Sequence, residues 1–209
     1  MRVNYARRIL VRNDSLHADH YHCGMLGSYR IEGYAIISAN GMIADASREM
    51  PPSIRYEADQ RFLQNELDRA AALVHGRHSY EGSARATRRR RLIVTRRVPS
   101  TAPDPDNDLA LFWNPTGATF ETALAALGVS NGTIAIIGGT EVFGLFLPYY
   151  DAFHLSCATK ARIPGGTPLF AQVAAGATPQ QVLSQAELKA GPQRDLDAAA
   201  GVTLVTWQR

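Results

Sequence analysis

The order of apolar and polar positions divides most of the chain into short strands and amphipathic helices. The continuous apolar run at 134–137 predicts a strand buried on both faces, because a half-exposed strand would alternate with polar residues. Apolar residues at helical spacing follow over 142–147, and Pro148 ends that pattern. Gly138 and Gly139 therefore lie between a strand end and a helix start, where the backbone can approach a ligand closely and free N–H groups favour an anion.

The same alternation continues through the chain and predicts its fold class. Further strands are expected from Tyr34 to the Asn40-Gly41 turn, at 73–76, 92–95 and 152–160, and at the C-terminus in 201–209. Helices are expected from residue 57, with an apolar stripe to Ala70, and at 119–128, capped by Thr119. Residues 98–118 are rich in Pro, Asp and Asn and predict a loop with room for a short strand. Alternating strands and helices indicate an α/β protein with a largely parallel sheet, and the late strands indicate an antiparallel C-terminal edge.

Length and composition favour one globular domain. The chain has 209 residues, of which 45% are hydrophobic and 20% charged, and no apolar stretch reaches the ~20 residues of a membrane span. Residues 1–29 predict no regular element and are interpreted as an N-terminal extension before a domain at 30–209. The histidines and cysteine at 17–23 lack the spacing of a zinc site, so no metal is expected. Cys23 and Cys157 form no disulfide framework, which is typical of a reducing, cytoplasmic setting.

The net charge of +3 conceals a strongly basic segment. Seven arginines lie within 85–97, interrupted by the apolar stretch 92–94. This pattern indicates an anionic partner, which could be nucleic acid, a membrane surface or a phosphorylated small molecule. A strand edge protected from aggregation by charge is the alternative interpretation. Aromatic residues of the kind that stack on bases are not interleaved here, which disfavours nucleic acid.

Several segments, in order, resemble the dihydrofolate reductase superfamily, which includes the reductase domain of riboflavin biosynthesis. They are IISANGMIAD, GRHSYEG, RLIVTRR, IAIIGGTEVFGLFLPYYDAFHLS and GGTPLF, within residues 31–209. The resemblance implies a single-domain three-layer α/β fold of the dihydrofolate-reductase type. It also implies hydride transfer from NADPH to a C=N bond of a pterin- or folate-like substrate. In this family the paired glycines bind the NADPH pyrophosphate, usually through a cis Gly-Gly peptide.

The resemblance also implies a set of cofactor-binding residues. Gly76 to Ser79 match a second cofactor turn, and Arg96 matches the position that recognises the adenosine 2′-phosphate, a role suited to the planar guanidinium fork. Asn40 to Ile43 match the start of a mobile loop that covers the nicotinamide. The full implied set is Ala35, Ile43, Gly76, Arg77, His78, Ser79, Thr95, Arg96, Ile137, Gly138, Gly139, Thr140 and Glu141.

Asp59 is the candidate catalytic residue. Family members place one acid on the first helix, where it binds the amidine-like edge of the pterin, and a single carboxylate does this well in a nearly apolar pocket. The assignment requires a one-residue insertion before Gly76. An acid that complements the helix dipole is the alternative interpretation of Asp59, and Glu57 and Glu66 are weaker candidates for its role. The implied substrate-binding set is Ile36, Asp59, Leu63, Arg89 and Ser156.

Two members of that set have specific implied roles. Ser156 matches a hydroxyl that supports the substrate acid. Arg89 is nearest in register to the arginine that, in folate-specific members, grips the substrate's glutamate carboxylate.

Two other functions stay open from the sequence. One is a 5-amino-6-(5-phosphoribosylamino)uracil reductase, although Ile137 stands where riboflavin-type reductases usually carry an acid and no zinc-deaminase signature is present. The other is a basic nucleic-acid-binding or regulatory module on a reductase-like scaffold. The expected partner is a small-molecule substrate, and neither a nucleic acid nor a membrane is expected as a partner. Because the family includes both monomers and homodimers, the oligomeric state stays open.

Overall fold

A computed structural model of the chain describes residues 28–79 and 86–209. The N-terminal extension expected over 1–29 lies outside this part except for Ser28 and Tyr29, and so do the histidines and cysteine at 17–23. Among the described residues, no helix has both the length and the apolar character needed to cross a membrane.

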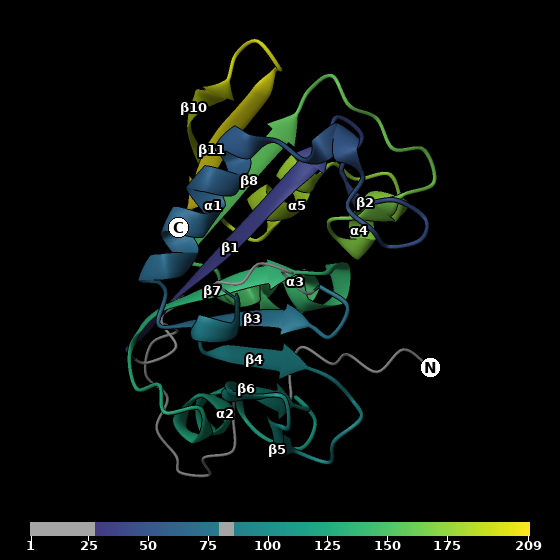
Figure 1. The fold of residues 1–209 in the computed structure, drawn as a ribbon. Helices are drawn as coiled ribbons and strands as arrows, with labels where there is room; N and C mark the ends of the chain where they lie inside the picture. The colour runs from purple at the N-terminus through teal and green to yellow at the C-terminus, as the bar shows by residue number, and fades with distance from the viewer. Residues whose placement is uncertain (1–27, 80–85) are drawn as a thin grey trace.

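A nine-stranded sheet forms the centre of the molecule, in the order β10-β11-β8-β1-β7-β3-β4-β6-β5 (Figure 1). The strands from β8 to β6 pair in parallel, whereas β11 and β10 continue antiparallel on one side and β5 on the other. The bounds are β1 Tyr29–Ser38, β3 Ala72–Gly76, β4 Arg91–Val94, β5 Thr101–Asp104, β6 Asn107–Trp113, β7 Gly132–Gly138, β8 Ala152–Ala158, β10 Lys189–Asp197 and β11 Val202–Gln208. The predicted fold class is confirmed, including the antiparallel C-terminal edge.

Helices cover both faces of this sheet and make three layers. Along β1, Tyr29, Ile31 and Ile37 pack in the main core with the helices of one face, while Tyr34 packs with Leu67 of α1 on the other. In Figure 1, α1 lies in front of the sheet. The helices are α1 Glu57–Arg69, α2 Phe120–Ala126, α3 Thr140–Phe146, α4 Ala171–Ala174 and α5 Pro179–Gln185, with short 3-10 turns η2 Pro52–Ile54, η3 Ala86–Arg88 and η4 Leu147–Tyr149 and a small second sheet of β2 Met42–Ala44 and β9 Thr167–Pro168.

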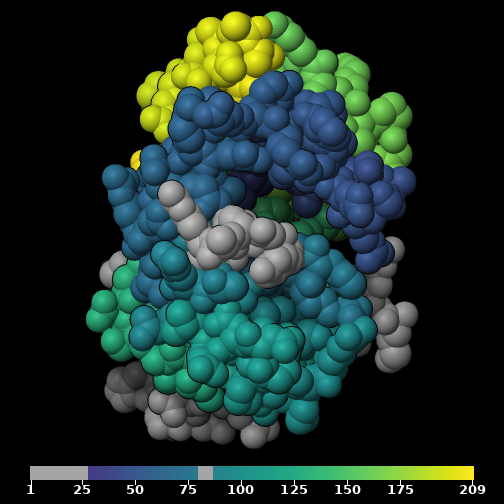
Figure 2. Space-filling model, viewed as in Figure 1, coloured from purple at the N-terminus to yellow at the C-terminus, as the bar shows by residue number. Residues whose placement is uncertain are grey.

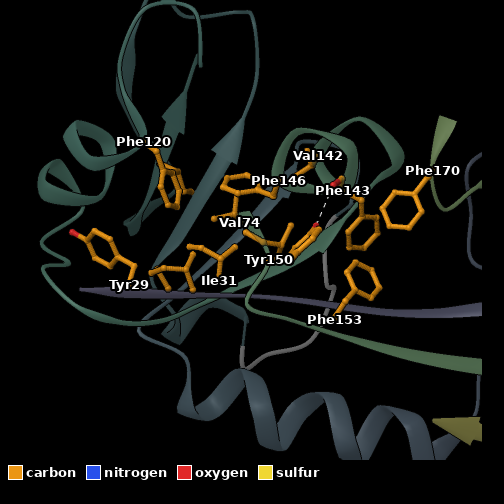
Figure 3. Packing of buried hydrophobic residues seen from close by; sticks show 14 of the residues in the cluster. Tyr29, Ile31, Val74, Phe120, Val142, Phe143, Phe146, Tyr150, Phe153 and Phe170 are labelled. Atoms are coloured by element: carbon orange, nitrogen blue, oxygen red, sulfur yellow. Dashed lines mark hydrogen bonds between the residues drawn. The ribbon is translucent and has the colours of Figure 1, made fainter. Parts of the chain in front are cut away.

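Aromatic side chains fix α3 against the sheet (Figure 3). The ring of Phe143 lies 5.6 Å from that of Phe153, and the Tyr150 hydroxyl donates to the Phe143 carbonyl at 3.2 Å. Phe153 occupies the space above Gly33, where an added Cβ would lie 2.3 Å from the ring. This packing holds the start of α3, and with it the paired glycines, at the end of β7.

Several boundaries differ from those expected from the pattern. β1 begins at Tyr29 rather than Tyr34, since its first half alternates with Arg30 and Glu32 instead of forming a continuous apolar run. Residues 101–113 form the hairpin β5–β6 rather than a loop. The edge strand β10, whose residues are mostly exposed, and the helices α4 and α5 were not anticipated. The cap at Thr119 is confirmed, because its hydroxyl accepts from the Thr122 N–H at 3.2 Å.

Candidate functional site

A large cleft lies at the carboxyl ends of the parallel strands. Its volume of about 2520 Å³ exceeds the usual ~300–1,000 Å³ of a single small-molecule pocket. Figure 2 shows the surface hollowed between the blue segment that carries α1 and the teal segment below it. The chain passes from β1 to β3 on one side, returns to β7 between these two strands, and then crosses to β8 on the other side of β1, so the direction of strand order changes around β1. Such a reversal is where open α/β sheets bind ligands.

Two strand-to-helix turns meet on one wall of the cleft. The Gly138–Gly139 peptide is cis, as the resemblance implies, and Gly138 has φ +115°. A Cβ added to Gly138 would lie 3.0 Å from the Phe143 ring, and one added to Gly139 would lie 3.3 Å from Ser79 Oγ. Side chains at either glycine would therefore crowd the turn, and the bare backbone leaves a cradle at the start of α3.

The second turn follows β3 and faces the first. The Ser79 N–H donates to the Gly76 carbonyl at 2.9 Å, which closes a tight turn over Gly76–Ser79. All four residues of this turn line the cleft, including Arg77 and His78. Cationic and hydroxyl side chains thus line the cleft beside the paired glycines, and such groups favour an anion.

Basic side chains lie farther along the same wall, after β4. Thr95 is buried, whereas Arg96 and Arg97 are exposed and line the cleft. The Arg97 N–H donates to Thr95 Oγ1 at 3.2 Å. Asn114 holds this segment, since its amide donates to the Val98 carbonyl at 2.9 Å while its side-chain oxygen accepts from Thr116.

Asp59 lies in the first turn of α1 and faces the other end of the cleft. Its residue is only 7% exposed, and burial raises the pKa of its carboxyl group, which a hydrogen bond from Ser156 on β8 partly offsets. Glu57, by contrast, has a side chain 82% exposed and pairs with Arg61 at the surface. Glu66 pairs with Arg69. The structure thus brings Asp59 and Ser156 together, whereas the alternative acids Glu57 and Glu66 pair with arginines of α1.

A partly buried carboxylate, which the sequence did not reveal, lies on the same pair of strands as Ser156. Glu32 on β1 accepts from the Tyr34 hydroxyl and from Arg30 Nε, and His154 Nε2 lies 3.5 Å from its Oε2. Burial alone would raise the pKa of Glu32, but these partners outweigh it and lower the pKa to about 2. Tyr34 and His154 stack at 4.6 Å and, together with Phe62, line the cleft.

Most of the remaining implied residues also line the cleft. These are Ala35, Ile36, Ile43, Leu63, Ile137, Thr140 and Glu141, whereas Gly138 lies just behind the surface. Arg89 does not line it, contrary to the role that the resemblance implies. Its guanidinium lies on the far side of α1 and bonds to Asp68 and Gln64. Arg48 and Arg55, from the segment between β2 and α1, line the cleft and were missed because nothing in their sequence context marks them.

The described residues contain no group of three or more His, Cys, Asp or Glu side chains arranged to hold a metal ion.

Comparison with solved structures identifies the fold. A dihydrofolate reductase from Enterococcus faecalis, complexed with NADP(H) and RAB-propyl, matches with a TM-score of 0.59 at 16% identity, over 86% of this chain and 96% of that one. A diaminohydroxyphosphoribosylaminopyrimidine deaminase/5-amino-6-(5-phosphoribosylamino)uracil reductase from Thermotoga maritima matches with a TM-score of 0.58 at 15% identity. That match covers 86% of this chain and 56% of the Thermotoga chain, so this chain spans little more than half of that protein.

A pyrimidine reductase-like protein from Corynebacterium diphtheriae also matches, with a TM-score of 0.58 at 15% identity over 86% of this chain and 91% of that one. No protein-family model matches the sequence, and comparison with curated proteins finds no significant match. The chain therefore has a dihydrofolate-reductase-like fold, as the resemblance of the sequence motifs implies, and the solved structures that it matches include reductases.

Proposed function

We propose that the protein is an NADPH-dependent reductase that transfers hydride to a C=N bond of a pterin- or folate-like substrate. The observation that carries this proposal is the isolated carboxylate of Asp59, buried in the cleft with Ser156 as its partner. A buried carboxylate with open acceptor positions binds an amidine-like edge strongly, because the low local dielectric strengthens a charge-assisted pair. In that arrangement Asp59 favours the protonated ring and orients it.

The residues of the opposite wall fit a dinucleotide. Gly139 and Thr140 at the start of α3 and the facing turn Gly76–Ser79 would hold the pyrophosphate, with the bare glycine backbone allowing close approach. Arg96 and Arg97 would hold a 2′-phosphate. The nicotinamide of the bound cofactor supplies the hydride. The apolar wall of Ile36, Ile43 and Leu63 would exclude water from the reacting atoms.

A reductase for a ribosylaminouracil phosphate is the second candidate, and Arg48 and Arg55 favour it. Both line the cleft outside the cofactor wall. Their charges would suit a phosphate on the substrate. Dihydrofolate, a dihydropterin and the aminouracil phosphate should therefore be assayed side by side.

The experiment is steady-state NADPH or NADH oxidation with each of these substrates, by the wild type and by Arg96→Ala. The proposal expects turnover with a dihydropterin or dihydrofolate. It also expects a preference for NADPH that falls by about tenfold or more in Arg96→Ala, since a charge-assisted phosphate contact contributes ~1.5–3 kcal/mol. Equal use of NADH and NADPH by the wild type would contradict the cofactor assignment. Turnover with the aminouracil alone would favour the second candidate.

A further inference from the structure

The second half of α1 separates the cleft from a smaller hollow of about 450 Å³. Leu67 lines both spaces, and Gln64, one turn earlier, lines the cleft. Arg89 lines the hollow and bonds to Gln64 of the helix, with Nη2 donating to Gln64 Oε1 at 2.8 Å. The Arg89 guanidinium thus contacts a residue that itself lines the cleft.

The guanidinium of Arg89 already holds a carboxylate of the chain itself. Nε and Nη2 both donate to Asp68 Oδ1, at 3.1 and 2.5 Å. The Arg89 side chain is 7% exposed and that of Asp68 49% exposed, so the cation is buried and the acid closes the site from the solvent side. A planar guanidinium is the group best suited to grip a carboxylate, and here that capacity is occupied.

We propose that Asp68 is a specificity-determining residue whose carboxylate occupies Arg89 in place of a carboxylate on the substrate. The cleft then takes a compact reduced pterin without an aminobenzoyl-glutamate tail. This inference rests on the proposed function, and it names the substrate class within it.

Competition between tethered and free carboxylates supports this substrate class. Asp68 lies one turn from Gln64 on the same helix, so its pairing with Arg89 costs no association entropy, whereas a substrate tail would have to displace it from solution. If a substrate carboxylate displaced Asp68 from Arg89, the unpaired Asp68 carboxylate would also lie beside a second negative charge. Arg88 and Arg90 line the hollow too, but both are exposed, and exposed ion pairs contribute only ~0–1 kcal/mol.

The test compares KM for 7,8-dihydrofolate with KM for a tail-less 7,8-dihydropterin. The variants are Asp68→Asn, Asp68→Asn with Arg89→Met, and Glu57→Gln, which removes one charge from the exposed start of the same helix. We expect the wild type to show no preference for dihydrofolate. Asp68→Asn should shift the KM ratio toward dihydrofolate by about three- to tenfold, the scale of a charge-assisted bond in a partly exposed site. The double variant should lose this shift, and Glu57→Gln should show none.

Two results would overturn the inference about Asp68 without contradicting the proposed reductase activity. One is a wild-type preference for dihydrofolate of about tenfold or more, which is the discrimination that one carboxylate contact supplies. The other is an unchanged ratio in Asp68→Asn. The Kd values of folate and pterin, from fluorescence quenching, give the same comparison without turnover. If the protein binds NADPH but neither pterin compound, the proposed substrate and this inference fail together.

Discussion

Two carboxylates have opposite surroundings: Asp59 on α1 is buried, and Glu32 on β1 is partly buried. Glu32 has three side-chain partners, from Tyr34, Arg30 and His154, and its pKa is lowered to about 2 despite burial. In the described part of the chain, Asp59 receives a side-chain hydrogen bond from Ser156 alone, and burial raises its pKa. His154 and Ser156, which belong to the two sites, lie two residues apart on β8. In the register with β1, Tyr34 pairs with His154 and Ile36 pairs with Ser156.

The difference separates a carboxylate that holds the fold together from one that is available to a ligand. Hydrogen bonds from Tyr34 and Arg30 stabilise the charge of Glu32, and His154 lies beside it. Asp59 keeps acceptor capacity directed into the cleft, at the cost of a poorly stabilised charge. Carboxyl groups whose pKa is raised by burial in a cleft are candidates for functional sites. The comparison makes opposite predictions for neutral substitutions at the two positions.

The largest expected effect is on activity at Asp59. Asp59→Asn should lower kcat/KM for the reduced substrate by about 100-fold or more, because the amide can neither favour the protonated ring nor pair with it ionically. NADPH affinity, measured by fluorescence, should stay unchanged, since the cofactor wall is formed by other elements. Glu57→Gln, on the same helix turn, is the matched control and should keep full activity. Retention of more than about a tenth of kcat/KM in Asp59→Asn would assign the role elsewhere.

Glu32 should show a loss of stability instead. Its pKa is lowered by folding, so its contribution is complete above the unfolded value of about 4.3 and disappears as pH falls toward about 2. Glu32→Gln should lower the free energy of unfolding by about 1–3 kcal/mol at neutral pH, after allowance for partial solvent screening. Urea unfolding at several pH values would measure this, and the gap from wild type should close in acid. A gap that is undiminished at about pH 2 and below would show that packing, rather than charge, is responsible.

Asp59→Asn should have the opposite, smaller effect on stability. Because folding raises the Asp59 pKa, the ionised carboxylate opposes folding once pH exceeds the folded value, and the neutral amide removes that cost. The variant should therefore melt above the wild type at neutral pH, by about 2–4 °C for each 1 kcal/mol regained in a chain of this size. The two melting temperatures should converge near pH 4, where the unfolded carboxyl also protonates. A variant less stable than wild type at pH 7 would mean that Asp59 is a structural acid like Glu32.

The contrast between these two acids also shows what the sequence could predict. The Gly138-Gly139 turn was readable because one local pattern, a continuous apolar strand followed by helical spacing, placed it at a strand end. Asp59 was selected because the resemblance implies one acid on the first helix, although its spacing from Gly76 required a one-residue insertion. The Glu32–His154 pair could not be predicted from the sequence, because it joins positions 122 residues apart that meet only through the parallel register of β1 and β8.

The placement of Arg89 outside the lining of the cleft has a similar cause. Among consecutive arginines, sequence alone does not indicate which guanidinium faces the cleft and which meets an acid on a neighbouring helix. In the structure, Arg89 is the arginine that bonds to Asp68. This contact joins residues 21 positions apart through the packing of α1 beside β4. The hairpin β5–β6 was hidden for a different reason, because its Pro, Asp and Asn content is typical of loops.

The smallest expected effect is at Ser156, the side-chain donor to Asp59. Ser156→Ala removes the hydrogen bond that lowers the Asp59 pKa, so that pKa should rise further. The midpoint of the kcat/KM pH profile that belongs to Asp59, identified because it vanishes in Asp59→Asn, should move to higher pH. The rate at the optimum should change by less than about tenfold, because a single hydrogen bond contributes ~0.5–1.5 kcal/mol. In the Asp59→Asn background the same substitution should leave the profile unaltered, since coupled residues are not additive. A midpoint that moves to lower pH in Ser156→Ala would show that the serine accepts from a protonated Asp59, and the asymmetry between the two carboxylates would then need another cause.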